Sequence, residues 1–134
     1  MNSLLSFGYT LLGNELAALL EARGLDPYLG FYHGIQYGRP SLAMDLLEPF
    51  RPAVDLFTMK LANLKILQPD HFTQRKGGYY LKDRGLKTYF KYFERWMNSV
   101  DRSGRTLRDW LRQQVNALAR AIQNNTDFTP YRMS

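Results

Sequence analysis

Apolar side chains recur every three or four residues in several separate stretches of this chain, and this spacing is typical of helices that bury one face. Stretches dominated by Gly, Pro and polar residues separate them, as expected for connections. The helices are expected over residues 2–22, 41–48, 53–67, 83–97 and 105–123. At 134 residues the chain has the size of one domain. The sequence therefore predicts an all-α fold, a single helical domain of five or six helices over residues 1–134.

Glycine and proline residues indicate where these helices end, pack closely or kink. Gly24 is a stop for the first helix, while Gly8 and Gly13 inside it indicate close helix packing. Pro49 and Pro52 are expected to kink the chain between two helices because each lacks an amide donor. The polar stretch 69–80 is expected to be a loop with a short helical turn around His71 and Phe72. The apolar side chains that the spacing assigns to the core include Val54, Leu56, Phe57, Leu61, Leu64, Phe90 and Ile122.

Composition excludes several classes of protein. The chain has no cysteine, which excludes disulfides, thiolate-bound zinc and a cysteine nucleophile. It has no run of eighteen apolar residues, and its first residues do not resemble a signal peptide. We therefore expect a soluble, cytoplasmic protein that does not contact membranes, in which any metal is held by His, Asp or Glu.

The positive charge lies in the second half of the chain. Residues 1–70 carry a net charge of −2, whereas residues 71–134 carry +8. Basic residues beside a metal site suit a bound polyanion, because they supply sequence-independent affinity for phosphates. Lys87, Lys91 and Arg95 recur at every fourth position and are predicted to form a DNA-binding stripe, together with Lys82 and Arg84. The alternative is an ordinary solvated, basic helix face.

One group of residues has the chemistry of a metal site. Asp45 and Glu48 are three residues apart, so both carboxylates can lie on one helix face. A turn after His33 can bring its imidazole over them, and Arg51 adds a guanidinium suited to a phosphate. These ligands suit Mg²⁺ or Mn²⁺ and would also accept zinc. The alternatives are a structural histidine and a carboxylate pair that is solvated or paired with Arg51.

Two runs of sequence resemble a known family. Residues 24–33 read GLDPYLGFYH and residues 41–52 read SLAMDLLEPFRP. They closely resemble the signature of the CRISPR-associated integrase called Cas-one, which is approximately GLDP-x-x-G-F-x-H followed by S-L-x-x-D-L-x-E-P-F-R-P. The segment that begins at Asn2 resembles the helix before this signature. The resemblance implies the carboxyl-terminal helical lobe of a metal-dependent DNA endonuclease and integrase.

The resemblance also implies roles and partners. His33 and Glu48 match metal ligands of the family, and Asp45 matches a neighbouring acidic position, so these three are the expected catalytic residues. The implied partners are DNA (a prespacer and the CRISPR repeat), a second CRISPR adaptation protein and further copies of the chain. Related proteins have another metal-binding glutamate and a β domain before Asn2. Glu15 does not occupy the position of that glutamate and is expected to face solvent.

Two functions therefore stand as hypotheses. The first is an integrase domain with an incomplete metal site, weak or inactive alone. The second is a non-catalytic module, derived from such an integrase, that binds DNA or self-associates. Mn²⁺-dependent cleavage of branched DNA would distinguish the two.

Overall fold

The computed structural model describes residues 2–27, 41–75 and 78–124. The α-helices are α1 (Asn2–Ala22), α2 (Ser41–Leu47), α3 (Arg51–Asn63), α4 (Asp83–Met97) and α5 (Leu107–Asn124). Two 3-10 helices, η1 (Glu48–Phe50) and η2 (Pro69–His71), and two strands, β1 (Phe72–Arg75) and β2 (Gly78–Leu81), complete the described part. The predicted all-α class is confirmed, with four long helices and the seven-residue α2.

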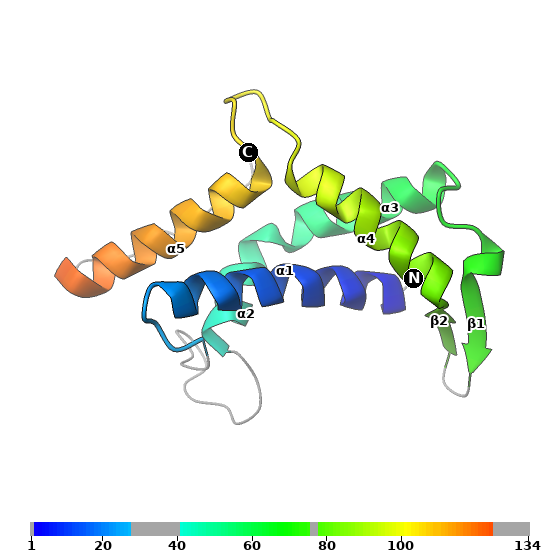
Figure 1. Cartoon of the computed structure of the whole chain (residues 1–134), viewed down its shortest axis with the longest axis horizontal. Helices are drawn as coiled ribbons and strands as arrows, with labels where there is room; N and C mark the ends of the chain where they lie inside the picture. Colours follow the sequence, from blue (N-terminus) through cyan, green and yellow to red (C-terminus); the bar gives the residue numbers. More distant parts are fainter. Residues whose placement is uncertain (1, 28–40, 76–77, 125–134) are drawn as a thin grey trace.

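Helix α1 lies in the middle of the molecule (Figure 1). It contacts α2, α3, α5 and β2, and α4 contacts α5, β2 and η2. In Figure 1, α5 and α4 lie on the same side of α1, one toward each end, and the loop between them forms the top of the view. Because α1 contacts three other helices and β2, its buried leucines form the middle of the core. No helix in the described ranges is long and apolar enough to cross a membrane.

The core joins side chains from every long helix. Its fully buried members include Leu12, Leu16, Leu20, Phe50, Val54, Tyr89, Phe93, Met97, Leu111, Val115 and Leu118. Aromatic rings fill the space between α1, α3 and α4. Phe57 stacks on Trp96 with ring centroids 4.6 Å apart, and its edge meets Tyr89 at 5.5 Å. Such pairs stabilise a core beyond the area they bury.

Helices α1 and α3 end in the same hydrogen-bonding pattern. After α1, Gly24 has φ +76° and the N–H of Leu25 donates to the carbonyl of Leu20 at 2.9 Å, which confirms the predicted stop. After α3, Lys65 has φ +58° and the N–H of Ile66 donates to the carbonyl of Leu61 at 3.0 Å. The predicted end of this helix at residue 67 was wrong by four residues, because Lys65 adopts the left-handed conformation that usually selects Gly.

The predicted loop over residues 69–80 was wrong in part. A turn is present as η2, but β1 and β2 pair as antiparallel strands, with Phe72 opposite Leu81 and Arg75 opposite Gly78. Phe, Thr and Tyr flank the Gly pair and favour strands, which explains why these residues pair instead of forming a loop. His71 is structural as expected, since its Nδ1 accepts the N–H of Gln68 at 2.9 Å.

Four residues assigned to the core are largely exposed. Their exposed fractions are 54% for Leu56, 69% for Leu64, 48% for Phe90 and 53% for Ile122. Val54, Phe57 and Leu61, from the same assignment, are buried. Helical spacing identifies the apolar side of a helix but not how far a neighbouring element covers it, which explains the difference.

The connection between α4 and α5 is a compact turn organised by Asp101. Its carboxylate accepts the N–H of Ser103 at 2.8 Å, the N–H of Arg105 at 3.1 Å and the indole N–H of Trp110 at 2.7 Å. The carboxylate also accepts a hydrogen bond from the Ser103 hydroxyl at 2.6 Å. This bond is the largest cause, and together with the others it holds the pKa of Asp101 well below its usual range. The turn is therefore held by one ionised side chain.

Replacing Tyr89 by Phe is expected to lower the free energy of unfolding by about 1 kcal/mol. The Tyr89 and Thr58 hydroxyls share a hydrogen bond of 2.9 Å, and both residues are fully buried. Burial raises the pKa of Tyr89 from 10.0 to about 12, so its stabilisation is complete below pH 10 and is lost as the pH rises through 12. Denaturant unfolding at pH 8 and pH 11 should show a difference between wild type and Tyr89→Phe that shrinks at the higher pH. A constant difference would contradict the assignment.

Candidate metal and DNA-binding site

The predicted metal ligands occupy different environments. Asp45 lies on α2 and is only 6% exposed, whereas the Glu48 side chain, at the start of η1, is 56% exposed. His33 lies outside the described residues. Within residues 2–27, 41–75 and 78–124, no three His, Asp or Glu side chains come together as a metal site. The three-ligand site therefore remains a prediction.

Two prolines shape the backbone that carries Glu48. Pro49 stands in the first turn of η1 and Pro52 in the first turn of α3, where a missing N–H is tolerated. Phe50 between them is fully buried and fixes this corner to the core. The predicted kink is confirmed. Glu48 before it and Arg51 after it both have partly exposed side chains at this corner.

Arg51 is held from two sides. Its Nη1 donates to Oε1 of Glu48 at 2.9 Å, and its Cζ lies 4.5 Å from the centre of the Tyr9 ring. The hydroxyl of Tyr9 donates to Oδ1 of Asp55. We call Tyr9, Glu48, Arg51 and Asp55 the Arg51 cluster. The cluster joins α1, η1 and α3 through one guanidinium. The contacts with Glu48 and Tyr9 therefore fix the orientation of the Arg51 side chain.

The pKa values of Arg51 and Tyr9 are both raised within the Arg51 cluster. The hydrogen bond to Glu48 is the main cause that raises the pKa of Arg51. Burial, followed by the hydrogen bond to Asp55, raises the pKa of Tyr9, whose phenol therefore stays protonated. The alternative that Glu48 pairs with Arg51 is thus observed. A phosphate that replaced this carboxylate would meet a guanidinium already in position.

The sequence predicted only part of the Arg51 cluster. Glu48 and Arg51 were among the predicted site residues, whereas Tyr9 and Asp55 were not. The hydroxyl of Tyr9 is satisfied by its bond to Asp55, and its ring lies under the Arg51 guanidinium. The available signal was the four-residue spacing from Arg51 to Asp55, which puts both on one helix face.

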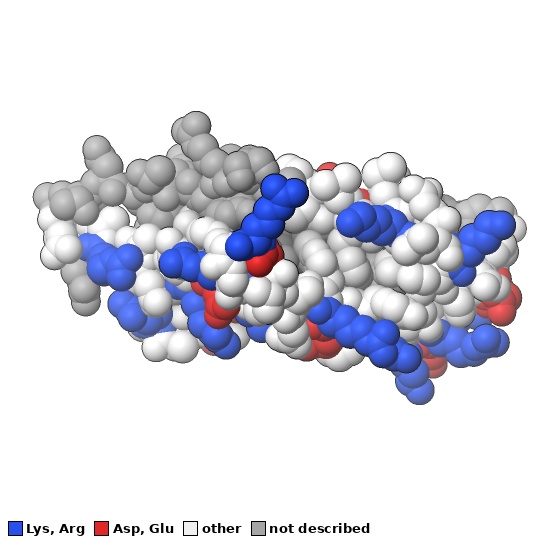
Figure 2. All heavy atoms as spheres, turned by 90° about the horizontal axis from the view of Figure 1, so that it is seen from above, with Lys and Arg blue, Asp and Glu red and all other residues white. Residues whose placement is uncertain are grey.

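The predicted basic stripe lies on the exposed side of α4. Lys87, Lys91 and Arg95 are all exposed, opposite the buried Tyr89 and Phe93. The Tyr92 ring lies 5.9 Å from Nζ of Lys91 and 5.3 Å from Cζ of Arg95. Basic side chains are spread over the face of the molecule shown in Figure 2.

The other predicted DNA contacts lie at the start of α4. Lys82 is the residue before the helix and is exposed. Arg84 makes an exposed ion pair with Asp70 at 3.6 Å, a distance at which the pair is weak. Both cations remain accessible to a large anion.

Glu15 was expected to face solvent, but its side chain is only 28% exposed and is ion-paired with Arg108. Nε of Arg108 donates to both oxygens of Glu15 at 3.1 and 3.2 Å, and Nη2 donates to Glu94 at 2.8 and 2.9 Å. Nη1 of Arg108 donates to Asn98 at 3.0 Å. Arg108 therefore ties α5 to α1 and α4. The helical pattern did not indicate this because Glu15 and Arg108 are 93 residues apart.

Known proteins share both the sequence and the fold. A sequence model of the family "CRISPR associated protein Cas1" matches residues 1–95. The CRISPR-associated endonuclease Cas1 1 of Thermodesulfovibrio yellowstonii is 40% identical over 129 residues, which make up 95% of this chain and 38% of that protein. The Leptospira interrogans endonuclease Cas1 is 43% identical over 94 residues, which make up 69% of this chain and 37% of that protein. This chain belongs to the Cas1 family.

Solved structures agree with this assignment. A Cas1 protein from Thermotoga maritima superposes with a TM-score of 0.84 at 28% identity, over 95% of this chain and 42% of that one. A casposase bound to an integration product gives 0.84 at 28% identity, over 96% and 39%. Cas1 in a partial Cas6-RT-Cas1–Cas2 complex gives 0.87 at 26% identity, over 99% and 42%. The chain thus spans less than half the length of these relatives and corresponds to their carboxyl-terminal part.

Proposed function

We propose that this chain is the helical lobe of a CRISPR spacer-acquisition endonuclease and integrase, with His33, Asp45 and Glu48 as ligands of Mg²⁺ or Mn²⁺. The observation that carries the proposal is the pairing of Glu48 with Arg51 inside the segment that matches Cas1. Glu48 offers an exposed oxygen ligand. Arg51, held over Tyr9, offers a phosphate contact next to it.

The available donors fit a hard divalent cation. Two carboxylates and one imidazole, without any thiolate, are ligands that Mg²⁺ and Mn²⁺ accept. Bound there, such an ion would polarise a DNA phosphate and stabilise the leaving oxygen. Arg51 would exchange Glu48 for a phosphate oxygen, and the bond from Tyr9 to Asp55 would keep the ring beneath the guanidinium during this exchange.

We infer the partners from the relatives and from the charge of the chain. The casposase is bound to an integration product, and other related Cas1 chains stand in complexes with Cas2. For this chain we propose binding to prespacer and repeat DNA through Arg51, Lys82, Arg84 and the α4 stripe, and assembly with further copies and a Cas2-like protein. A cytoplasmic location follows from this role.

Manganese binding and DNA cleavage test the proposal. Glu48→Gln and His33→Ala should each weaken Mn²⁺ binding, measured by electron paramagnetic resonance, by about tenfold or more. Both should remove any Mn²⁺-dependent cleavage of branched DNA by the wild type. Glu21→Gln, which changes an exposed glutamate on α1, is the matched control and should alter neither. Unchanged Mn²⁺ affinity in both variants would overturn the metal assignment.

The same assays test the non-catalytic alternative. A chain that yields no product with Mn²⁺, yet binds DNA with an affinity that falls as salt rises, would be a DNA-binding module derived from an integrase. Self-association is read separately from sedimentation of the wild type. A strict monomer would contradict the oligomerisation part of the proposal.

A further inference from the structure

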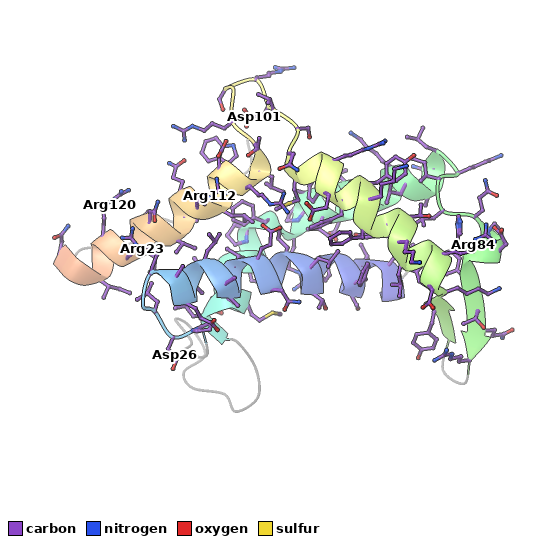
Figure 3. The ribbon with its side chains drawn as sticks, viewed as in Figure 1. Arg23, Asp26, Arg84, Asp101, Arg112 and Arg120 are labelled. Atoms are coloured by element: carbon purple, nitrogen blue, oxygen red, sulfur yellow. The ribbon has the colours of Figure 1, made fainter. Side chains whose placement is uncertain are left out.

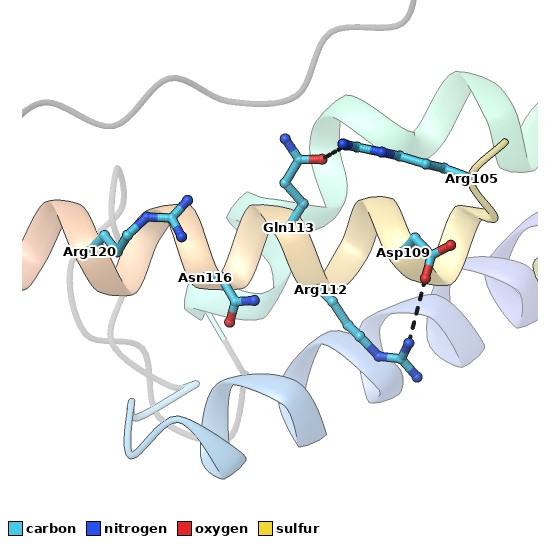
Figure 4. Close-up of a pocket in the computed structure, with 6 residues that line it drawn as sticks. All are labelled: Arg105, Asp109, Arg112, Gln113, Asn116 and Arg120. Carbon is cyan, nitrogen blue, oxygen red and sulfur yellow. Dashed lines mark hydrogen bonds and ion pairs between the residues drawn. The ribbon is translucent and has the colours of Figure 1, made fainter. Parts of the chain in front are cut away.

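A second basic surface lies on α5 and the turn before it, on different elements from the Arg51 cluster and the α4 stripe. It is an open pocket of about 380 Å³ lined by Arg105, Asp109, Arg112, Gln113, Asn116 and Arg120. Figure 3 places Arg112 and Arg120 along α5, and Figure 4 shows the pocket from close by. We call these six residues the α5 pocket. None of them was among the predicted DNA contacts.

The helical repeat explains why the polar groups gather there. Leu111, Val115 and Leu118 are fully buried and set the inner face of α5. Arg112, Asn116 and Arg120 follow one another at intervals of four, so they form a row along the helix. Arg112 and Arg120 are thus separated by about 12 Å along the axis. This distance spans about three to four nucleotides of a B-DNA strand.

The α5 pocket has an excess of positive charge. It holds three guanidiniums and one carboxylate, that of Asp109. Asp109 accepts the backbone N–H of Thr106 at 2.9 Å, a bond that lowers its pKa, and pairs with Arg112 at 3.6 Å. Arg120 makes no ion pair with a side chain in the described part of the chain, and in Figure 4 its guanidinium turns back along α5 toward Gln113. One carboxylate cannot neutralise these cations.

The neighbouring groups select the kind of anion. Arg105 donates to the side chain of Gln113, and its Cζ lies 4.9 Å from the centre of the Trp110 ring, so it is held at the rim of the pocket. Guanidinium and amide donors together suit phosphodiester oxygens. Trp110 does not line the pocket, and none of the six residues that do is aromatic, so the pocket offers no ring for base stacking. These features favour the backbone of duplex DNA over single strands.

We propose that the α5 pocket is a second DNA-binding site, which contacts backbone phosphates of a duplex through Arg112, Arg120 and Arg105. The inference rests on the proposed function, because that function supplies DNA as the molecule to be bound. It adds a surface that lies on different elements from both the metal site and the α4 stripe. The contact would be independent of DNA sequence, because it reaches no base edge.

Charge reversal in the α5 pocket tests the inference. The double variant Arg112→Glu/Arg120→Glu should bind a fluorescein-labelled duplex of mixed sequence at least tenfold more weakly, measured by fluorescence anisotropy. The slope of log affinity against log salt should fall by about 2. The matched control is Lys60→Glu/Arg75→Glu, which makes the same change in net charge at two exposed positions on α3 and β1. It should change affinity far less.

A gain of affinity provides an independent check. Asp109→Asn removes the only carboxylate of the α5 pocket while keeping a side chain that can accept the Thr106 N–H. It should tighten duplex binding about threefold. All of these side chains lie at or near the surface, and circular dichroism of each variant verifies that the fold is kept.

The outcomes separate this inference from the proposed function. If Lys87→Glu/Lys91→Glu/Arg95→Glu weakens duplex binding while the α5 double variant binds like the control, the α5 pocket is not a DNA site and the proposed function stands. If the wild type binds no duplex at low salt, DNA binding by this chain is wrong, and both proposals lose their ligand. Weakening by the α5 double variant beyond that of its control supports the inference.

Discussion

Gly8→Ala is expected to lower the free energy of unfolding by about 3 kcal/mol, although alanine is the better helix former. A Cβ at this position would lie 2.7 Å from Cγ1 of Val54 and would also overlap the hydroxyl of Tyr89. Both neighbours belong to the close-packed core and cannot move without disturbing it. Denaturant unfolding followed by circular dichroism measures the change.

Gly13 provides the matched control on the same helix. A Cβ at Gly13 meets nothing within 4 Å, so Gly13→Ala should raise stability by about 1 kcal/mol. A second check uses Tyr89→Phe, which removes one of the two atoms that obstruct Gly8. The penalty of Gly8→Ala should be smaller in the Tyr89→Phe background than in the wild type. Equal penalties would show that the Tyr89 hydroxyl does not limit this position.

Arg108→Met is the second substitution with a large expected effect, a loss of about 3 kcal/mol. Methionine keeps much of the apolar stem of Arg108 but removes the charge that both Glu15 and Glu94 contact. Two carboxylates that are only 28% and 35% exposed would then lie close together without a counter-ion. We place the loss at the low end for a broken ion pair because water still reaches both groups.

Two variants separate the charge effect from lost packing. Arg112→Met lies one turn further along α5, where the side chain is 60% exposed and its ion pair is long, and should change stability by less than about 0.5 kcal/mol. Adding Glu15→Gln and Glu94→Gln to Arg108→Met should recover part of the loss, because the opposed charges are then gone. No recovery would mean that the stem of Arg108, not its charge, stabilises the contact.

The helices could be predicted because each carries its own pattern. The leucines of α1 and the stop at Gly24 gave this helix its observed bounds, Asn2–Ala22. The end of α3 could not be found in this way, because Lys65 adopts a conformation that its residue type seldom selects. The exposure of Leu56 depends on what lies beside α3, a property of the tertiary structure that spacing does not contain.

In the candidate site too, contacts between residues close in the sequence could be predicted, and contacts between distant residues could not. Glu48 and Arg51 are close in the sequence, so their pairing could be considered from spacing alone. Tyr9 reaches Arg51 from another helix, 42 positions away along the chain, and only the packing of α1 on α3 brings them together. The Cas1 signature identified the segment, but it carried no information about the α5 pocket.

The turn around Asp101 has a consequence for how the chain folds. The partners of its carboxylate lie no more than nine residues away, so this corner can form from local contacts before the distant ends of the chain meet. The contact between Arg108 and Glu15, by contrast, closes a loop of 93 residues. We therefore expect the corner between α4 and α5 to form early in folding. The two helices would then pack together against α1, and the contact of Arg108 with Glu15 would form last.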